Sequence, residues 1–139
     1  MKTTLILFLL VINGLCHAVT MTTADGLNID ADVVEMNFKT GVFTHEGNVS
    51  ITKEGLSFNA DYMEERRQNN EVTELKAHGS PMVYINTLRT DQGVYRGEAK
   101  ELHYDKYKGK VTLTNYVLVD AAGNTHTGRN QGTFTLKTD

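Results

Sequence analysis

The chain has 139 residues, a net charge of −3, one cysteine, one proline and no tryptophan. With 14 basic against 17 acidic residues, it lacks the positive charge that proteins use to neutralise nucleic-acid phosphates, and we expect no nucleic-acid partner. A single cysteine excludes an internal disulfide framework.

The first 18 residues are typical of a secretory signal peptide. Lys2 precedes an unbroken apolar run over residues 5–12, which is shorter than the roughly 20 apolar residues that a membrane-spanning helix needs. Cys16-His17-Ala18 then offers the small residues that signal peptidase requires, so we expect cleavage after Ala18. The mature protein is then a single domain, residues 19–139.

Two other interpretations of this leader stay open. It could be an uncleaved membrane anchor. It could also belong to a lipoprotein acylated at Cys16, although Asn13-Gly14-Leu15 fits a lipidation signal poorly.

From Leu27 onward, apolar and polar residues alternate with a period of two, and helical periodicity is nearly absent. Residues 111–115 and 133–136 alternate strictly, as half-buried strands do. Glycine-containing turns such as 78–81 and 108–110 separate the segments. The pattern predicts an all-β fold, either a sandwich, a barrel or a related architecture.

Two short units recur along these strands. The first begins with Ile29-Asp30-Ala31-Asp32 and occupies residues 29–35, 58–64, 97–102 and, in degenerate form, a stretch from 128. The second occupies residues 46–51, 78–83 and 114–119. Such copies cannot bury an apolar face individually, so they must stack around a shared interior. The small residue in the first unit, Ala31, Ala60 or Ala99, suits a bend or a close approach of strands.

The order and spacing of Gly-Asn-Val at 47–49 and Asn-Ala-Asp at 59–61, with their copies, resemble the OstA/LptA family (organic solvent tolerance-like N-terminal domain) over residues 26–136. The resemblance implies an OstA-like β-jellyroll, an antiparallel sheet folded into a V or taco shape with an apolar groove. It implies a periplasmic, non-enzymatic protein that binds lipopolysaccharide, bridges the inner and outer membranes and contributes to outer-membrane assembly. It also implies end-to-end pairing of edge strands with similarly folded inner- and outer-membrane components.

Lipid A acyl chains need a continuous apolar surface, which large uncharged residues inside the V would provide. The candidates are Leu27, Ile29, Val49, Ile51, Phe58, Tyr62, Tyr84, Leu102, Tyr104, Val117 and Phe134, with Val33, Met82 and Leu113 beside them. By the resemblance, Leu27, Ile29, Tyr84 and Tyr104 match family positions that line the groove. The alternative is that these side chains merely pack a core.

We expect neither a metal, nor a cofactor, nor catalysis. The histidines after the leader are His45, His78, His103 and His126, about one per repeat and without the close spacing of zinc motifs. We expect them on exposed strand faces. The serines lack a nucleophile-elbow context, and the carboxylates are scattered along the chain.

Two charged segments predict solvated hairpin tips: the run Glu64–Asn70, and a basic turn with Lys106, Lys108 and Lys110. Either could meet lipid phosphates.

The first repeat, residues 27–35, and the last, residues 125–136, have no further copy beyond them, so each should leave an unpaired strand edge. Neither carries the proline or dense lysine that blocks pairing, so we expect head-to-tail association or pairing with partners of similar fold. Two other functions stay open. One is a structural or adaptor β module of the envelope, with a groove filled by its own side chains. The other is an inner-membrane-associated component of the same transport system, which should keep a longer hydrophobic helix.

Overall fold

The computed structural model describes residues 19–23, 26–69 and 71–137. The expected signal peptide lies outside them, so cleavage after Ala18 stays a prediction. Within the described residues, no helix is long and apolar enough to cross a membrane. The strands are β1 (Val19–Thr22), β2 (Asn28–Ala31), β3 (Val33–Asn37), β4 (Val42–Lys53), β5 (Leu56–Gln68), β6 (Glu71–Thr90), β7 (Gly93–Asp105), β8 (Lys110–Asp120) and β9 (Thr125–Thr135).

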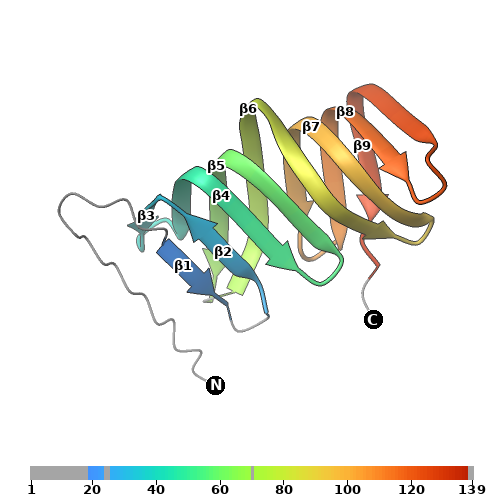
Figure 1. Cartoon of the computed structure of the whole chain (residues 1–139). Coiled ribbons are helices and arrows are strands. Elements are labelled where there is room, and N and C mark those ends of the chain that lie inside the picture. The colour runs from blue at the N-terminus through green and yellow to red at the C-terminus, as the bar shows by residue number, and fades with distance from the viewer. Residues whose placement is uncertain (1–18, 24–25, 70, 138–139) are drawn as a thin grey trace.

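All the strands pair antiparallel in one sheet, in the order β1-β2-β4-β5-β6-β7-β8-β9, with β3 pairing to the first part of β4. The long strands bend near their middles, so the sheet folds over into two facing layers (Figure 1). Layer A contains β1, β2 and residues 49–53, 56–60, 83–90, 93–99, 116–120 and 125–128. Layer B contains β3 and residues 42–46, 62–68, 71–78, 101–105, 110–114 and 131–135. The predicted all-β, V-shaped antiparallel fold is confirmed.

The bend arises where the two repeated units meet on neighbouring strands. The backbone N–H of Asp32 donates to the carbonyl of Gly47 (2.8 Å), and the side-chain amide of Asn48 donates to the Asp32 carboxylate (2.9 Å). One copy further on, the backbone N–H of Ser80 donates to the carboxylate of Asp61. Each Asp of the first unit therefore fixes the bend of the strand that carries the second unit.

The pairing register shifts at these bends, because each bulge inserts extra residues into the ladder. The β4–β5 register shifts between Glu46 and Val49, and the β5–β6 register shifts between Asn59 and Tyr62. Three alanines lie beside the bends with at most 7% of their surface exposed: Ala31, Ala60 and Ala99. The three alanines therefore lie at a bend, as predicted. A larger inward side chain would hold the two layers apart there.

The N-terminal edge differs from its prediction. Residues 27–35 do not leave one unpaired edge, because β1 pairs along β2 from Val19↔Ala31 to Thr22↔Asn28. The edge of layer A is therefore β1, and that of layer B is β3, which pairs with β4. At the other end, β9 is the edge strand, as predicted.

The charged run 64–70 is not simply a solvated tip, and this prediction was wrong for its inward members. Residues through Gln68 belong to β5, where alternation continues, so Glu65 and Arg67 are buried inside. His45 is likewise fully buried rather than on an exposed face. The basic turn after Asp105 does form a hairpin tip between β7 and β8, and Lys108 is exposed there.

Gly47→Ala tests the close packing at the bend. Gly47 has φ +77°, and an added Cβ would lie 2.6 Å from Oδ2 of Asp32. Gly123→Ala is the matched control, because Gly123 has φ +88° but no atom within 4 Å of an added Cβ. We expect Gly123→Ala to lower the free energy of unfolding in urea by about 1 kcal/mol, the cost of the left-handed backbone, and Gly47→Ala to lower it by clearly more. Equal losses would contradict the steric role of the Asp32 contact.

Candidate lipid-binding interior

The two layers enclose an apolar interior formed by alternate residues of every strand. From layer A the inward side chains include Leu27, Ile29, Val49, Ile51, Leu56, Phe58, Val83, Ile85, Leu88, Tyr95 and Leu118. From layer B they include Val34, Phe43, Met63, Leu75, Leu102, Tyr104, Val111 and Leu113. One row in layer B runs Phe43, Glu65, Leu75, Tyr104, Val111, Phe134 across successive strands. The interior is thus continuous from β4 to β9.

Most predicted groove residues lie in this interior. Seven of them are buried in the core cluster: Leu27, Ile29, Val49, Ile51, Phe58, Leu102 and Tyr104. Phe134 is partly buried and packs against the same cluster. Of the additional candidates, Leu113 is also buried, Met82 is partly buried and Val33 is exposed.

The other three groove candidates lie on the outer face. Tyr84 is 50% exposed and Val117 is 40% exposed, while Tyr62 stacks on the exposed ring of His78 with centroids 4.8 Å apart. The bulges explain Tyr62 and Val117, because each register shift reverses which residues point inward beyond the bend. Tyr84 alternates with the buried Val83 and Ile85, so it points outward.

Several interior residues escaped the sequence prediction, among them Met63, Leu75, Val83, Ile85, Leu88, Val111 and Leu118. Counting the alternation separately on each side of every bend would have found them. The buried ionic groups were missed because charged residues are normally placed outside. The sequence did contain an indication of their burial. Glu65 and Arg67 follow the apolar Met63 at intervals of two residues, so all three side chains point to the same face of the strand.

The interior is tightly closed by its own side chains. Ile29, Val49, Ile51 and Phe58 have no exposed surface. A hollow of about 510 Å³ lies instead on the outer face, lined largely by polar residues from β5 to β9 that include Lys76, His78 and Glu101. Around Ile29, Val49 and Phe58, the side chains between the layers are closed to solvent.

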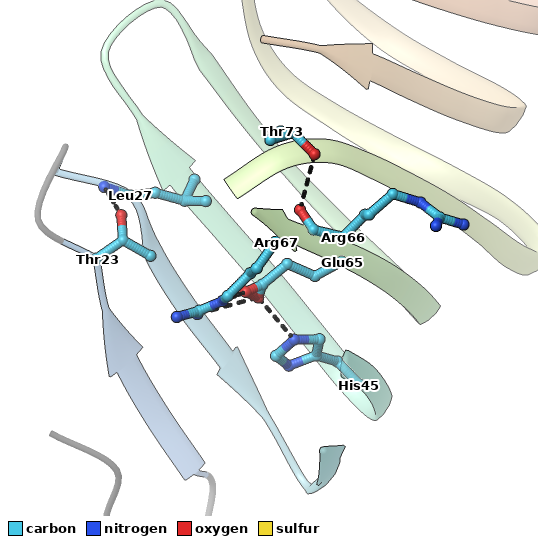
Figure 2. A network of polar contacts seen from close by, with 7 residues as sticks. All are labelled: Thr23, Leu27, His45, Glu65, Arg66, Arg67 and Thr73. Atoms are coloured by element: carbon cyan, nitrogen blue, oxygen red, sulfur yellow. Dashed lines mark hydrogen bonds and ion pairs between the residues drawn. The ribbon is translucent and has the colours of Figure 1, made fainter. Parts of the chain in front are cut away.

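A buried polar network lies inside near the β1–β3 end (Figure 2). Nε2 of His45 lies 3.2 Å from Oε2 of Glu65, and Arg67 makes an ion pair with the same carboxylate through Nε and Nη2. The Arg67 guanidinium also lies 4.6 Å from the ring centroid of Phe43. Three charged or polar side chains thus contact one another inside an apolar space, where His45 Nδ1 and Arg67 Nη1 have no hydrogen-bond partner.

The β9 end of the interior is aromatic instead. The ring of Phe134 contacts the rings of Tyr116 (5.5 Å between centroids) and Tyr95 (6.1 Å). Tyr116 lies directly over Gly128 and Gly132 of β9, where an added Cβ would approach the Tyr116 side chain to 2.5 Å. These glycines leave the room that the Tyr116 ring fills, so the two ends of the interior differ in chemistry.

Two side chains near the site have clearly shifted pKa values. Burial, and then the carboxylates of Glu64, Glu46 and Glu35, raise the pKa of Tyr62. A hydrogen bond with His126 (2.9 Å), and then the backbone N–H of Asn124, lower the pKa of Asp120 from 3.8 to about 2. Because the folded-state value is lowered, the stabilisation by Asp120 is present above about pH 4 and is lost as the pH falls through 2.

Some backbone N–H groups of β9 point away from β8. The backbone N–H of Leu136 donates to the carbonyl of Gly109 (2.8 Å). Leu136 and Gly109 therefore continue the β8–β9 pairing register, in which Phe134 lies opposite Val111. Inward and outward N–H groups alternate along an antiparallel strand, so the N–H of Phe134 points to β8 and that of Thr133 points away from it.

The polar network should respond differently to single and double changes. Arg67→Met leaves the Glu65 carboxylate buried beside a single histidine, and we expect a loss of about 3 to 5 kcal/mol in the free energy of unfolding. Glu65→Leu combined with Arg67→Met removes both charges but leaves the buried His45 ring without its Glu65 contact, and we expect part of that loss to be recovered. Urea denaturation of both variants measures the difference. A double variant as unstable as the single one would contradict the ionic interpretation.

Comparison with known proteins agrees with this geometry. Residues 28–137 match the family model described as LptA/(LptD N-terminal domain) LPS transport protein. No curated protein matches the chain. Among solved structures, the chain is similar to LptH, the LptA homologous periplasmic component of the lipopolysaccharide transport device from Pseudomonas aeruginosa. The TM-score is 0.68 at 18% identity, over 80% of this chain and 76% of LptH.

The LptH likeness confirms the LptA β-jellyroll fold, and the family match covers nearly all of the described strands from β2 to β9. The resemblance deduced from the repeated units is confirmed, as is the expectation of a transport protein that is not an enzyme. The chain belongs to the family of LptA and LptD N-terminal domains, the lipopolysaccharide transport proteins.

Proposed function

We propose that this protein is a periplasmic carrier that holds the acyl chains of lipopolysaccharide between layers A and B and passes them along a bridge between the inner and outer membranes. The observation that carries the proposal is the interior between the layers, which runs across the strands from β4 to β9 and is apolar except for the network of His45, Glu65 and Arg67. Acyl chains are stabilised there by the removal of apolar surface from water. The periplasmic LptH has the same fold and supports this location.

The two ends of the sheet support assembly into a bridge. The β9 end presents one edge strand of 11 residues, and the opposite end presents β1 and β3. That opposite end also exposes apolar side chains, since Val33 is 58% exposed and Phe38 is 72% exposed. Edge pairing of β9 with β1 or β3 of a second copy, or of similarly folded membrane-associated components, would continue both the sheet and the interior.

A second candidate is an adaptor module whose interior never opens. The closed packing around Ile29, Val49 and Phe58 favours it, because none of these side chains is accessible to solvent. The two candidates differ in whether lipid contacts the inward residues, which can be measured directly.

Photo-crosslinking distinguishes the carrier from the adaptor. p-Benzoylphenylalanine replaces Tyr104 or Phe134, which point inward, and Tyr84, which points outward and serves as the matched control. In cells that make lipopolysaccharide, we expect lipopolysaccharide adducts from the two inward positions and far fewer from position 84. Adducts are detected by immunoblotting after irradiation. Equal labelling at all three positions would refute an interior lipid site, and labelling at none would favour the adaptor.

Proline at the β9 edge tests assembly. Thr133→Pro removes an N–H that points away from β8, so the monomer should stay folded while pairing with a second edge is lost. Thr133→Ala keeps the N–H and is the matched control. In sedimentation velocity over a concentration series, we expect the wild type and Thr133→Ala to associate, and Thr133→Pro to stay monomeric. Circular dichroism checks that both variants are folded. Association of folded Thr133→Pro at the wild-type level would exclude pairing through this part of β9.

A further inference from the structure

The two layers are joined covalently at the bends, whereas their hairpin turns meet on the opposite, open side. The turns of layer A on this side include residues 53–56 and 90–93, and those of layer B include residues 105–110. Any parting of the layers that leaves the bends intact must take place here. Contacts across this open side therefore decide how easily the interior can be reached.

The segment after β9 crosses this open side. Leu136 N donates to Gly109 O in a layer B turn (2.8 Å), and Lys137 N donates to Arg89 O at the end of β6 in layer A (2.9 Å). Leu136 also forms a β-bridge with Thr90. Two consecutive residues thus bind both layers through their backbone.

Side chains reinforce this crossing. Leu136 is 6% exposed and belongs to the core cluster, so it closes the apolar interior from the open side. An added Cβ on Gly55 would lie 3.1 Å from the carbonyl oxygen of Lys137, so the segment also lies against the β4–β5 turn. The Lys137 side chain itself is exposed.

We propose that Leu136–Lys137 is a latch that holds the layers closed, and that acyl chains enter sideways between the hairpin turns when it is released. The proposal rests on the carrier function proposed above and adds its route of entry. The latch depends on two backbone hydrogen bonds and one buried leucine, whereas the bends are covalent. Release therefore removes the backbone contacts across the open side without separating the strands of either layer.

A reversible lock tests the latch. Thr90 and Leu136 are bridge partners. Because the neighbouring Lys137 N–H donates to the carbonyl of Arg89, Thr90 and Leu136 form a non-hydrogen-bonded pair. The Cα atoms of such a pair are about 4.5 Å apart, so two cysteines at these positions can be joined by a disulfide. Thr90→Cys with Leu136→Cys is made in a Cys16→Ser background, because Cys16 is the one natural cysteine. Uptake of fluorescently labelled lipid A is followed by stopped flow. We expect uptake to be at least tenfold slower in the oxidised protein and to recover on reduction.

A second pair of variants loosens the latch. Lys137→Pro removes the N–H that binds Arg89 O, while Lys137→Ala keeps it. Loss of one backbone hydrogen bond should speed lipid A uptake by about two- to tenfold in Lys137→Pro and leave Lys137→Ala unchanged. Hydrogen exchange of the Leu136 amide, measured without lipid, should accelerate in Lys137→Pro alone.

The outcomes separate the latch from the carrier function. Equal uptake by the oxidised and reduced double-cysteine protein, or by Lys137→Pro and Lys137→Ala, would overturn the latch while lipid A uptake itself upheld the carrier. Absence of uptake in every protein, with Leu136 exchange still faster in Lys137→Pro, would refute the carrier but retain a latch that closes the layers. Unchanged exchange in Lys137→Pro would overturn the latch regardless of lipid.

Discussion

The structure depends on one constraint, which is that each long strand must bend at its middle at the same level as its neighbours. Asp32 with Gly47 and Asn48, and Asp61 with Ser80, provide this constraint in successive copies. Where these groups meet, the ladder shifts register and the sheet turns back on itself. The bend creates two facing layers from one sheet, so the apolar interior, its open side and its two ends all depend on it.

The ends of this interior differ in ways that suit different neighbours. Near β1–β3, the buried network of His45, Glu65 and Arg67 interrupts the apolar lining, and the cost of desolvating a buried ion pair of this kind offsets much of its attraction. Near β9, Phe134 and Tyr116 present apolar rings over glycines. The two ends of the interior therefore differ in chemistry, one aromatic and the other with a buried ionic network.

Under the proposed carrier function, the closed interior must open for the lipid and close again after its release. Burying the apolar residues between the layers stabilises the fold, and acyl chains can replace those contacts with others of the same kind. The covalent bends keep the layers aligned during such an exchange. On the open side, Leu136 covers the core, and the backbone of Leu136 and Lys137 contacts both layers.

The sequence by itself determined the strand content, the repeated units, the family, and most of the inward residues within unbroken strand segments. It placed Leu27, Ile29 and Phe58 inside correctly, because alternation with a period of two is a local property. It misplaced Tyr62 and Val117, because a bulge reverses the alternation and is fixed by hydrogen bonds to a neighbouring strand. Only the tertiary structure showed that β1 pairs along β2. Likewise, it alone showed that Glu65 and Arg67 are buried, since a charge becomes tolerable inside when its partner lies beside it.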